Sequence, residues 1–157
     1  MSIEALGTYL NDHLAGSVGA IEMVERVIRE TAGQPLARGL EKVLSEIKED
    51  QAVLVDLIER MGARESPLKK AGAWLAEKAG RVKLGGTGEP EALSRLEMLE
   101  TLIVGMHGRR ALWRALRTVV DRHPVLYSLD LDLLERRAQE QHDFVEQLRL
   151  EAAREVL

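Results

Sequence analysis

The sequence predicts an all-α protein that folds as an antiparallel bundle of four helices. Apolar residues recur every three or four positions along four long stretches, which is the period of a helix with one buried face. The stretches have similar lengths, and two of the three connections between them are short, which favours side-by-side packing in opposite directions. The chain has 157 residues, the size of one domain. We therefore expect a single bundle over residues 1–157.

The first two predicted helices form a hairpin. The first covers residues 3–31 and stops before Gly33 and Pro35, a pair typical of a helix end followed by a new helix start. The second covers residues 35–61 and ends at Gly62.

The last two predicted helices form a second hairpin. One covers residues 91–121, ahead of Pro124, and its apolar face is less regular than the others. The other covers residues 129–156 and begins after Ser128, which we expect to be its N-cap. Asp130 then falls in the first turn, where the helix dipole favours an acid.

The connection between the two hairpins is much longer. It contains Ser66-Pro67, a typical helix start, then a predicted short helix over about residues 67–82, then the sequence GGTG. One long crossover between two antiparallel hairpins is the connectivity of ferritin-like bundles. The sequence therefore predicts a ferritin-like bundle whose crossover between the second and third long helices contains a short helix.

Composition excludes several classes of function. The absence of cysteine rules out disulfides and thiolate metal sites and favours a reducing compartment. A net charge of −4 does not favour a nucleic-acid partner. The N-terminal sequence MSIEALGTYLNDHL does not resemble a signal peptide, and no stretch approaches the roughly 20 apolar residues of a membrane span. We expect a soluble cytoplasmic protein.

Polar residues interrupt the apolar faces near the middle of three predicted helices. These are Ser17, Asp50 and Gln141. In antiparallel helices of equal length, such positions should meet in one layer across the bundle. Ferritin-like proteins build metal sites at this level. The candidate metal ligands in or beside the layer are His13, Glu46, Asp50, Glu100, His107 and His142.

Two interpretations of this layer remain open. One is a metal site for iron or manganese, which would need carboxylates and Glu-x-x-His pairs. The last helix, however, has Gln139-x-x-His142, and the first helix has Ser17 where such a site would need a glutamate. The alternative, which the sequence favours, is a polar cluster in which Asp50 accepts hydrogen bonds from Ser17 and the Gln141 amide. A buried carboxylate needs such partners. The sequence assigns no catalytic and no cofactor-binding residue, and leaves open whether the protein is an enzyme.

Glycines also gather at mid-helix, in LAGSVGA (residues 14–20) and GMHG (residues 105–108). Each costs a helix about 1 kcal/mol relative to alanine. We expect close packing of the first and third long helices; the alternative is a ligand pocket walled by the glycines.

Charged segments suggest two surface features. The crossover holds Lys69, Lys70, Lys78, Arg81 and Lys83 around Trp74, which could contact an anionic membrane but more often caps a bundle. We also expect a salt-bridged face between the third long helix and acids on the second and fourth. Its arginines are Arg109, Arg110, Arg114 and Arg117.

Nearly the whole chain resembles a group of uncharacterised bacterial ferritin-like proteins. The segments that carry the resemblance are YLNDHLAGSVGAIEMVERV, EIKEDQAVLVDLIERMG, AWLAEKAGRVKLGG, LEMLETLIVGMHGRRALWRAL and RLEAAREVL. The resemblance implies the four-helix fold and self-association, and no particular reaction. The leading expectation is a non-enzymatic binding or structural module that forms a homo-oligomer. The alternatives are a metal-binding protein or di-metal oxidoreductase, and a peripheral anion- or membrane-surface-binding protein.

Overall fold

The computed structural model describes residues 3–62 and 91–157, and all regular structure in these ranges is helical. The prediction of an all-α protein is confirmed. The long helices are α1 (Ile3–Glu30), α2 (Pro35–Arg60), α4 (Glu91–Arg117) and α5 (Leu131–Val156), and two short 3-10 turns, η1 (Val120–Arg122) and η2 (Pro124–Ser128), join α4 to α5. The predicted crossover helix at 67–82 and its lysines lie outside the described residues.

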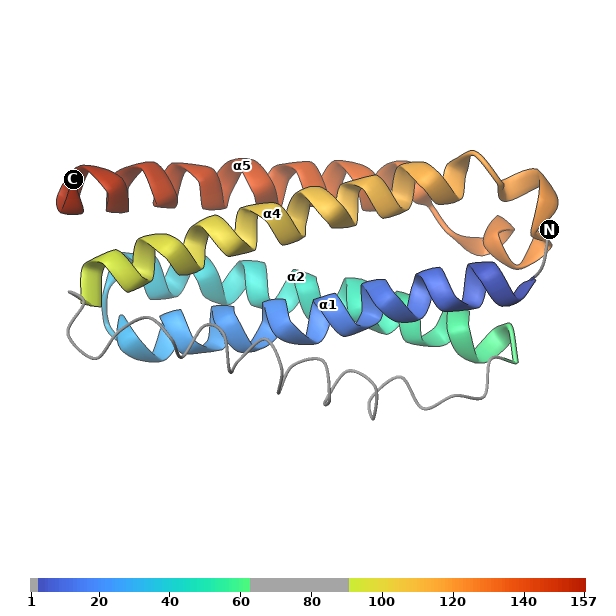
Figure 1. The fold of residues 1–157 in the computed structure, drawn as a ribbon, viewed down its shortest axis with the longest axis horizontal. Coiled ribbons are helices and arrows are strands. Elements are labelled where there is room, and N and C mark those ends of the chain that lie inside the picture. The colour runs from blue at the N-terminus through green and yellow to red at the C-terminus, as the bar shows by residue number, and fades with distance from the viewer. Residues whose placement is uncertain (1–2, 63–90) are drawn as a thin grey trace.

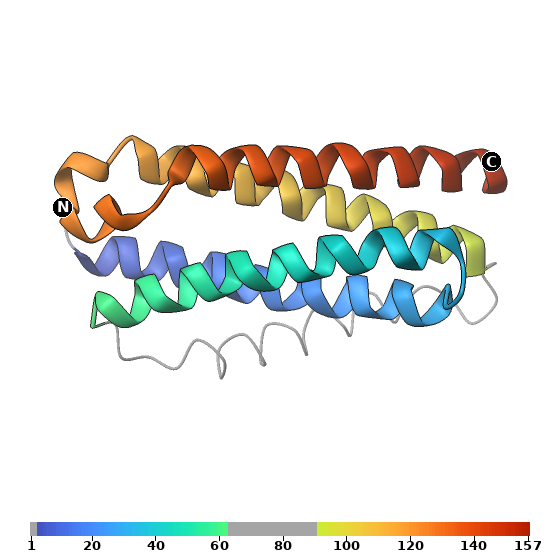
Figure 2. The same ribbon diagram turned by 180° about the vertical axis from the view of Figure 1, so that it is seen from behind.

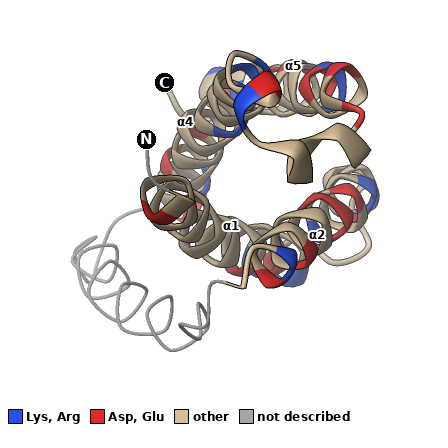
Figure 3. Cartoon of the chain, turned by 90° about the vertical axis from the view of Figure 1, so that its right-hand side faces the viewer, with Lys and Arg blue, Asp and Glu red and all other residues tan. Residues whose placement is uncertain are grey.

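The four long helices surround a common axis. Seen end-on, α1 lies beside α2 and α4, and α5 completes the ring between α4 and α2 (Figure 3). Neighbouring helices run antiparallel, whereas α2 and α4, which lie on a diagonal, run in the same direction (Figures 1 and 2). The closest pairs are α4 with α5 and α1 with α2, the two hairpins that short connections predict.

Apolar side chains fill the bundle as two clusters. One contains Leu10, Leu57 and Trp113 at the end near η2, and the other contains Ile47 and Leu99 toward the opposite end. All five side chains are fully buried, and burial of each apolar side chain stabilises the fold by about 1.5–3 kcal/mol. The buried polar residues Asp50, Arg109 and Gln141 belong to neither cluster.

The helix α4 ends at Arg117, earlier than the predicted residue 121. The backbone N–H of Thr118 bonds to the Ala115 carbonyl at 3.1 Å, and its hydroxyl donates to the same oxygen at 2.7 Å. Both bonds span three residues and tighten the chain into a 3-10 conformation. Pro124 then opens η2 rather than ending α4 directly.

The N-cap of α5 is Asp130, so the prediction of Ser128 as the cap is wrong. An Asp130 carboxylate oxygen accepts the backbone N–H of Leu133 at 3.0 Å. Ser128 closes η2, and its hydroxyl accepts a hydrogen bond from Arg60 at 2.8 Å, which ties α2 to the α4–α5 turn.

Within the described residues, none of the helices combines the length and the apolar character that crossing a membrane requires.

Candidate functional site

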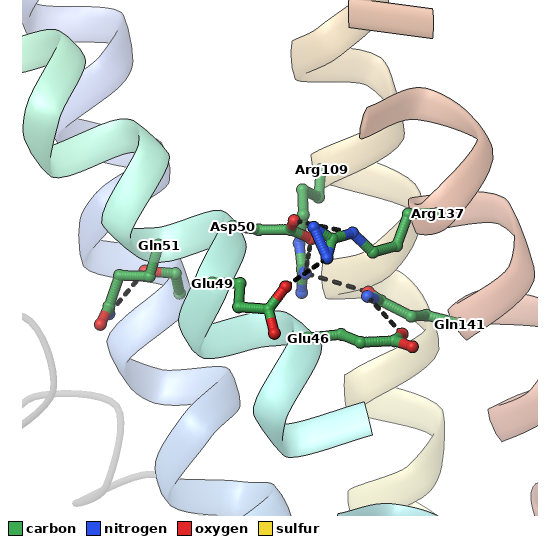
Figure 4. A network of polar contacts seen from close by, with 8 residues as sticks. Glu46, Glu49, Asp50, Gln51, Arg109, Arg137 and Gln141 are labelled. Carbon is green, nitrogen blue, oxygen red and sulfur yellow. Dashed lines mark hydrogen bonds and ion pairs between the residues drawn. The ribbon is translucent and has the colours of Figure 1, made fainter. Parts of the chain in front are cut away.

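The centre of the bundle contains an ion pair between α2 and α4. Asp50 is 1% exposed and Arg109 is 8% exposed. Arg109 Nη1 donates to Asp50 Oδ2 at 3.1 Å and also to Gln141 Oε1 on α5 at 3.0 Å (Figure 4). Arg137 of α5 forms a second ion pair with the other oxygen of Asp50, with 3.3 Å between Nε and Oδ1. One buried carboxylate is therefore shared by two guanidinium groups.

Two more acids extend these contacts toward the surface of α2. Gln141 Nε2 donates to Glu46 Oε2 at 3.0 Å, and Arg137 Nη1 donates to Glu49 Oε2 at 2.6 Å (Figure 4). We call the group formed by Glu46, Glu49, Asp50, Arg109, Arg137 and Gln141 the polar layer. It joins α2, α4 and α5 at one level.

Burial governs the ionisation of the central pair. Burial raises the pKa of the Asp50 carboxyl above its ordinary value, and the charges of Arg109 and Arg137 oppose that rise. Burial likewise lowers the pKa of Arg109, and Asp50 opposes the change. Each charge thus offsets part of the desolvation cost of the other.

Ser17 does not bond to Asp50, so that part of the predicted cluster is wrong. Its hydroxyl donates to the Leu14 carbonyl at 2.6 Å and accepts a hydrogen bond from Gln51 Nε2 at 2.9 Å. Gln51 follows Asp50 on α2, and a step of one residue turns a helix by about 100°. Asp50 therefore faces α4 and α5, whereas Gln51 faces α1 (Figure 4). Gln141 lies beside Asp50 as expected, but Arg109 connects the two.

Glu49, Arg109 and Arg137 are the members of the polar layer that the sequence analysis did not place in it. On α4, Arg109 occupies a position of the buried face, three residues after Met106 and three before Leu112. An arginine inside an apolar face was the available signal. Of the predicted salt-bridged face, Arg110, Arg114 and Arg117 form ion pairs with Glu135, whereas Arg109 turns inward.

The six candidate metal ligands are dispersed over four places. Asp50 and Glu46 lie in the polar layer, and His13 packs edge-on against Tyr9 with 4.7 Å between ring centroids. The Glu100 carboxylate accepts a hydrogen bond from Arg149 at 3.3 Å. The rings of His107 and His142 lie near each other, with 6.5 Å between their centroids. Within residues 3–62 and 91–157, no three His, Asp or Glu side chains form a group that could hold a metal ion.

Beside the polar layer, a cavity of about 730 Å³ opens between α1 and α4, with α2 as its floor. We call it the cleft. Its apolar lining comes from all three helices, and includes Ala20, Met23, Ile47, Leu54, Met98, Leu102, Val104 and Leu112. Arg109, Asp50, Ser17 and Gln51 also line it, so the polar layer and the Ser17 contact both border the cavity.

Glycines line the two long walls of the cleft. A Cβ atom added to Gly16 on α1, or to Gly105 or Gly108 on α4, would meet no atom within 4 Å. At Gly16, Gly105 and Gly108 the expectation of close packing is therefore wrong, because these glycines leave space even though α1 and α4 are in contact. Close approach occurs instead at Gly39, where a Cβ would lie 2.6 Å from Phe144 Cζ.

The lining also includes the titratable residues Asp12, His13, Glu22 and Arg26 of α1. Burial lowers the pKa of His13, and the neighbouring Asp12 carboxylate opposes that change. Arg26 is paired with Glu30 at 2.8 Å.

Arg109 is the side chain that connects the polar layer to the cleft. It lines the cavity, and both of its hydrogen bonds leave from Nη1. Its Nε and Nη2 groups make no hydrogen bond within the described part of the chain. A guanidinium group has five N–H donors, so most of this donor capacity is unused.

Comparison of the chain with protein-family models, with curated proteins and with solved structures finds no match. The fold and the site define a helical bundle with a central ion-paired layer and an apolar cleft.

Proposed function

We propose that the protein is a non-enzymatic binding module that holds an apolar small molecule in the cleft between α1 and α4. The observation that carries this proposal is the cavity of about 730 Å³, with a mostly apolar lining and glycines along both walls. Small-molecule sites are typically apolar clefts of about 300–1,000 Å³ with a few polar groups that orient the ligand.

The glycines support binding more than structural packing. Each glycine inside a helix costs about 1 kcal/mol relative to alanine, and here no close helix contact offsets that cost. A ligand that fills the cleft would make dispersion contacts with its apolar side chains.

A ferritin-like architecture is part of the proposal. The parallel, diagonal placement of α2 and α4 needs a connection that returns along the length of the bundle, which supports a crossover of the ferritin-like kind (Figure 1). Self-association stays a prediction, checked by the mass of the protein in light scattering. Metal binding and membrane-surface binding stay predictions as well, the latter because its lysines lie outside the described residues.

The test uses a neutral, environment-sensitive dye, Nile red, with the full chain after extraction of bound lipid. We expect saturable binding with increased fluorescence. Gly16→Leu and Gly108→Leu place a branched side chain in the cleft from opposite walls, and each should weaken binding at least about tenfold. Both replace glycine by a strong helix former, so the fold should persist.

The matched control is Ala111→Leu, at an exposed position of the same helix that does not line the cleft. It should bind the dye like the unmodified protein. Absence of saturable binding, or unchanged binding in both glycine variants, would refute the proposed function.

A further inference from the structure

Arg109 gives the cleft a specific chemistry. The side chain is more than nine-tenths buried, carries a positive charge and lines an otherwise apolar cavity. Its Nε and Nη2 donors have no partner within residues 3–62 and 91–157. Neither donor is among the buried unpaired atoms of the described residues, so both reach the solvent of the cleft. They are therefore available to an acceptor on a bound ligand.

The pairing of Arg109 itself, rather than the net charge of the polar layer, indicates that this acceptor is an anion. Two guanidinium groups, of Arg109 and Arg137, share the single deeply buried carboxylate of Asp50. Arg137 has a further partner in Glu49, whose side chain is 60% exposed. Among the described residues, the side-chain partners of Arg109 are only Asp50 and the neutral amide of Gln141. A second anion at Arg109 would give each guanidinium group its own carboxylate partner in addition to the shared Asp50.

We infer that the ligand of the cleft is an amphiphile with one apolar chain and one carboxylate, and that the carboxylate binds the guanidinium group of Arg109. This inference rests on the proposed function. A carboxylate matches the planar guanidinium group and accepts two parallel hydrogen bonds from it. The apolar chain occupies the space that Gly16, Gly105 and Gly108 leave open.

The acids of the lining favour a single head group. Asp12 and Glu22 are exposed residues of α1 that border the same cavity. Arg26, a cation of the same wall, is already paired with Glu30 at 2.8 Å. A second anionic group on the ligand, placed near Asp12 and Glu22, would therefore be repelled. The cleft is therefore suited to a monocarboxylate rather than to a dicarboxylate with charges at both ends of the chain.

The test compares two ligands that differ only in the head group. Dodecanoate and dodecanol, below their aggregation limits, are titrated into the delipidated full chain, and displacement of Nile red is measured. Dodecanoate should bind at least about tenfold more tightly, because a charge-assisted bidentate pair in a buried site contributes more than a neutral hydroxyl. Dodecyl phosphate should bind more weakly than dodecanoate; tighter binding would overturn the carboxylate assignment.

Variants of the polar layer then locate the head group. Arg109→Gln should remove the preference for dodecanoate and retain dodecanol binding. Asp50→Asn should have the opposite effect on dodecanoate, because it removes the carboxylate that competes for Arg109. The matched control is Arg110→Gln, on the same helix but outside the cleft, where the side chain pairs with Glu135. It should preserve the preference.

The outcomes separate the two proposals. If both ligands displace the dye with equal affinity, the carboxylate inference fails and the proposed function stands. If neither displaces it and the dye itself does not bind, both fail. If Arg109→Gln does not fold, Asp50→Asn decides the matter: unchanged or weakened dodecanoate binding in that variant contradicts the inference.

Discussion

Arg109 and Asp50 form an ion pair at 3.1 Å in the centre of the bundle, where both side chains are almost entirely removed from water. The pair joins α4 to α2, and Gln141 and Arg137 bring in α5. The same guanidinium group lines the cleft beneath α1. A single buried arginine thus links the stability of the bundle to the chemistry of its cavity.

The first prediction concerns the energetic coupling of this pair. Asp50→Ala should lower the free energy of unfolding by about 3–5 kcal/mol, because it leaves Arg109 buried without its main counter-charge. Replacing both partners by leucine should recover much of this loss, since no buried charge then remains. Urea unfolding of Asp50→Ala checks the loss, and urea unfolding of Asp50→Leu, Arg109→Leu and the double leucine variant measures the coupling. Additive losses would show that the two side chains are energetically independent.

The glycines of the cleft provide a second prediction. Gly16→Ala and Gly108→Ala should each raise the free energy of unfolding by about 0.5–1 kcal/mol, because the added methyl group enters open space and helix propensity improves. Gly39→Ala should not stabilise the protein, since its Cβ would clash with Phe144. Thermal or chemical unfolding compares the three. Equal stabilisation at all three positions would contradict the distinction between open and close-packed glycines.

The third prediction is a pH dependence that originates at His13. Burial lowers its pKa in the folded state below the ordinary value of about 6.5. Between the two pKa values the unfolded chain binds more protons than the folded chain, so stability rises with pH through this window. The contribution of His13 is fully present above about pH 6.5 and is lost as pH falls through the lowered pKa. In His13→Gln, the decrease in stability from pH 7.5 to pH 5.5 should be smaller, as measured by urea unfolding at both values; an identical decrease would contradict this.

The start of α5 provides a fourth prediction. Asp130→Ala should destabilise the protein by about 1 kcal/mol, because it removes the acceptor for the Leu133 N–H. Ser128→Ala should cost less, since the Ser128 hydroxyl makes two exposed hydrogen bonds, one accepted from Arg60 at 2.8 Å and one donated to the Val125 carbonyl at 3.4 Å, and neither caps α5. The urea concentration at the midpoint of unfolding, measured for both variants, shows which residue contributes more to stability. A larger loss for Ser128→Ala would restore Ser128 as the more important residue.

Much of the fold follows directly from the period of the apolar residues. The start of α2 at Pro35 agrees with prediction because a local signal sets it, a proline at the first helical position after Gln34. The end of α4 was placed too late, because the apolar valines at 119 and 120 continue the pattern while the backbone has already changed to a 3-10 conformation.

The site was predicted less completely, for geometric reasons. The mid-helix positions of Asp50 and Gln141 fix their level in the bundle, which is why both were selected. Ser17 also lies at the predicted height along the bundle. The sequence does not specify which of the other helices a side chain faces, and Ser17 contacts Gln51 rather than Asp50. The distance between α1 and α4 depends on packing of the whole bundle, so the sequence could not distinguish glycines at a close contact from glycines at a cavity.

The most direct test of the proposed ligand site is calorimetric titration of dodecanoate into the delipidated full chain. Gly108→Leu and Ala111→Leu are titrated in the same way. We predict one saturable site with a negative heat-capacity change, as expected when apolar surface is buried. Binding should weaken at least about tenfold in Gly108→Leu and be unchanged in Ala111→Leu. Dodecanoate binding of equal strength in all three proteins, or no binding in any, would contradict the assignment of the cleft as a ligand site.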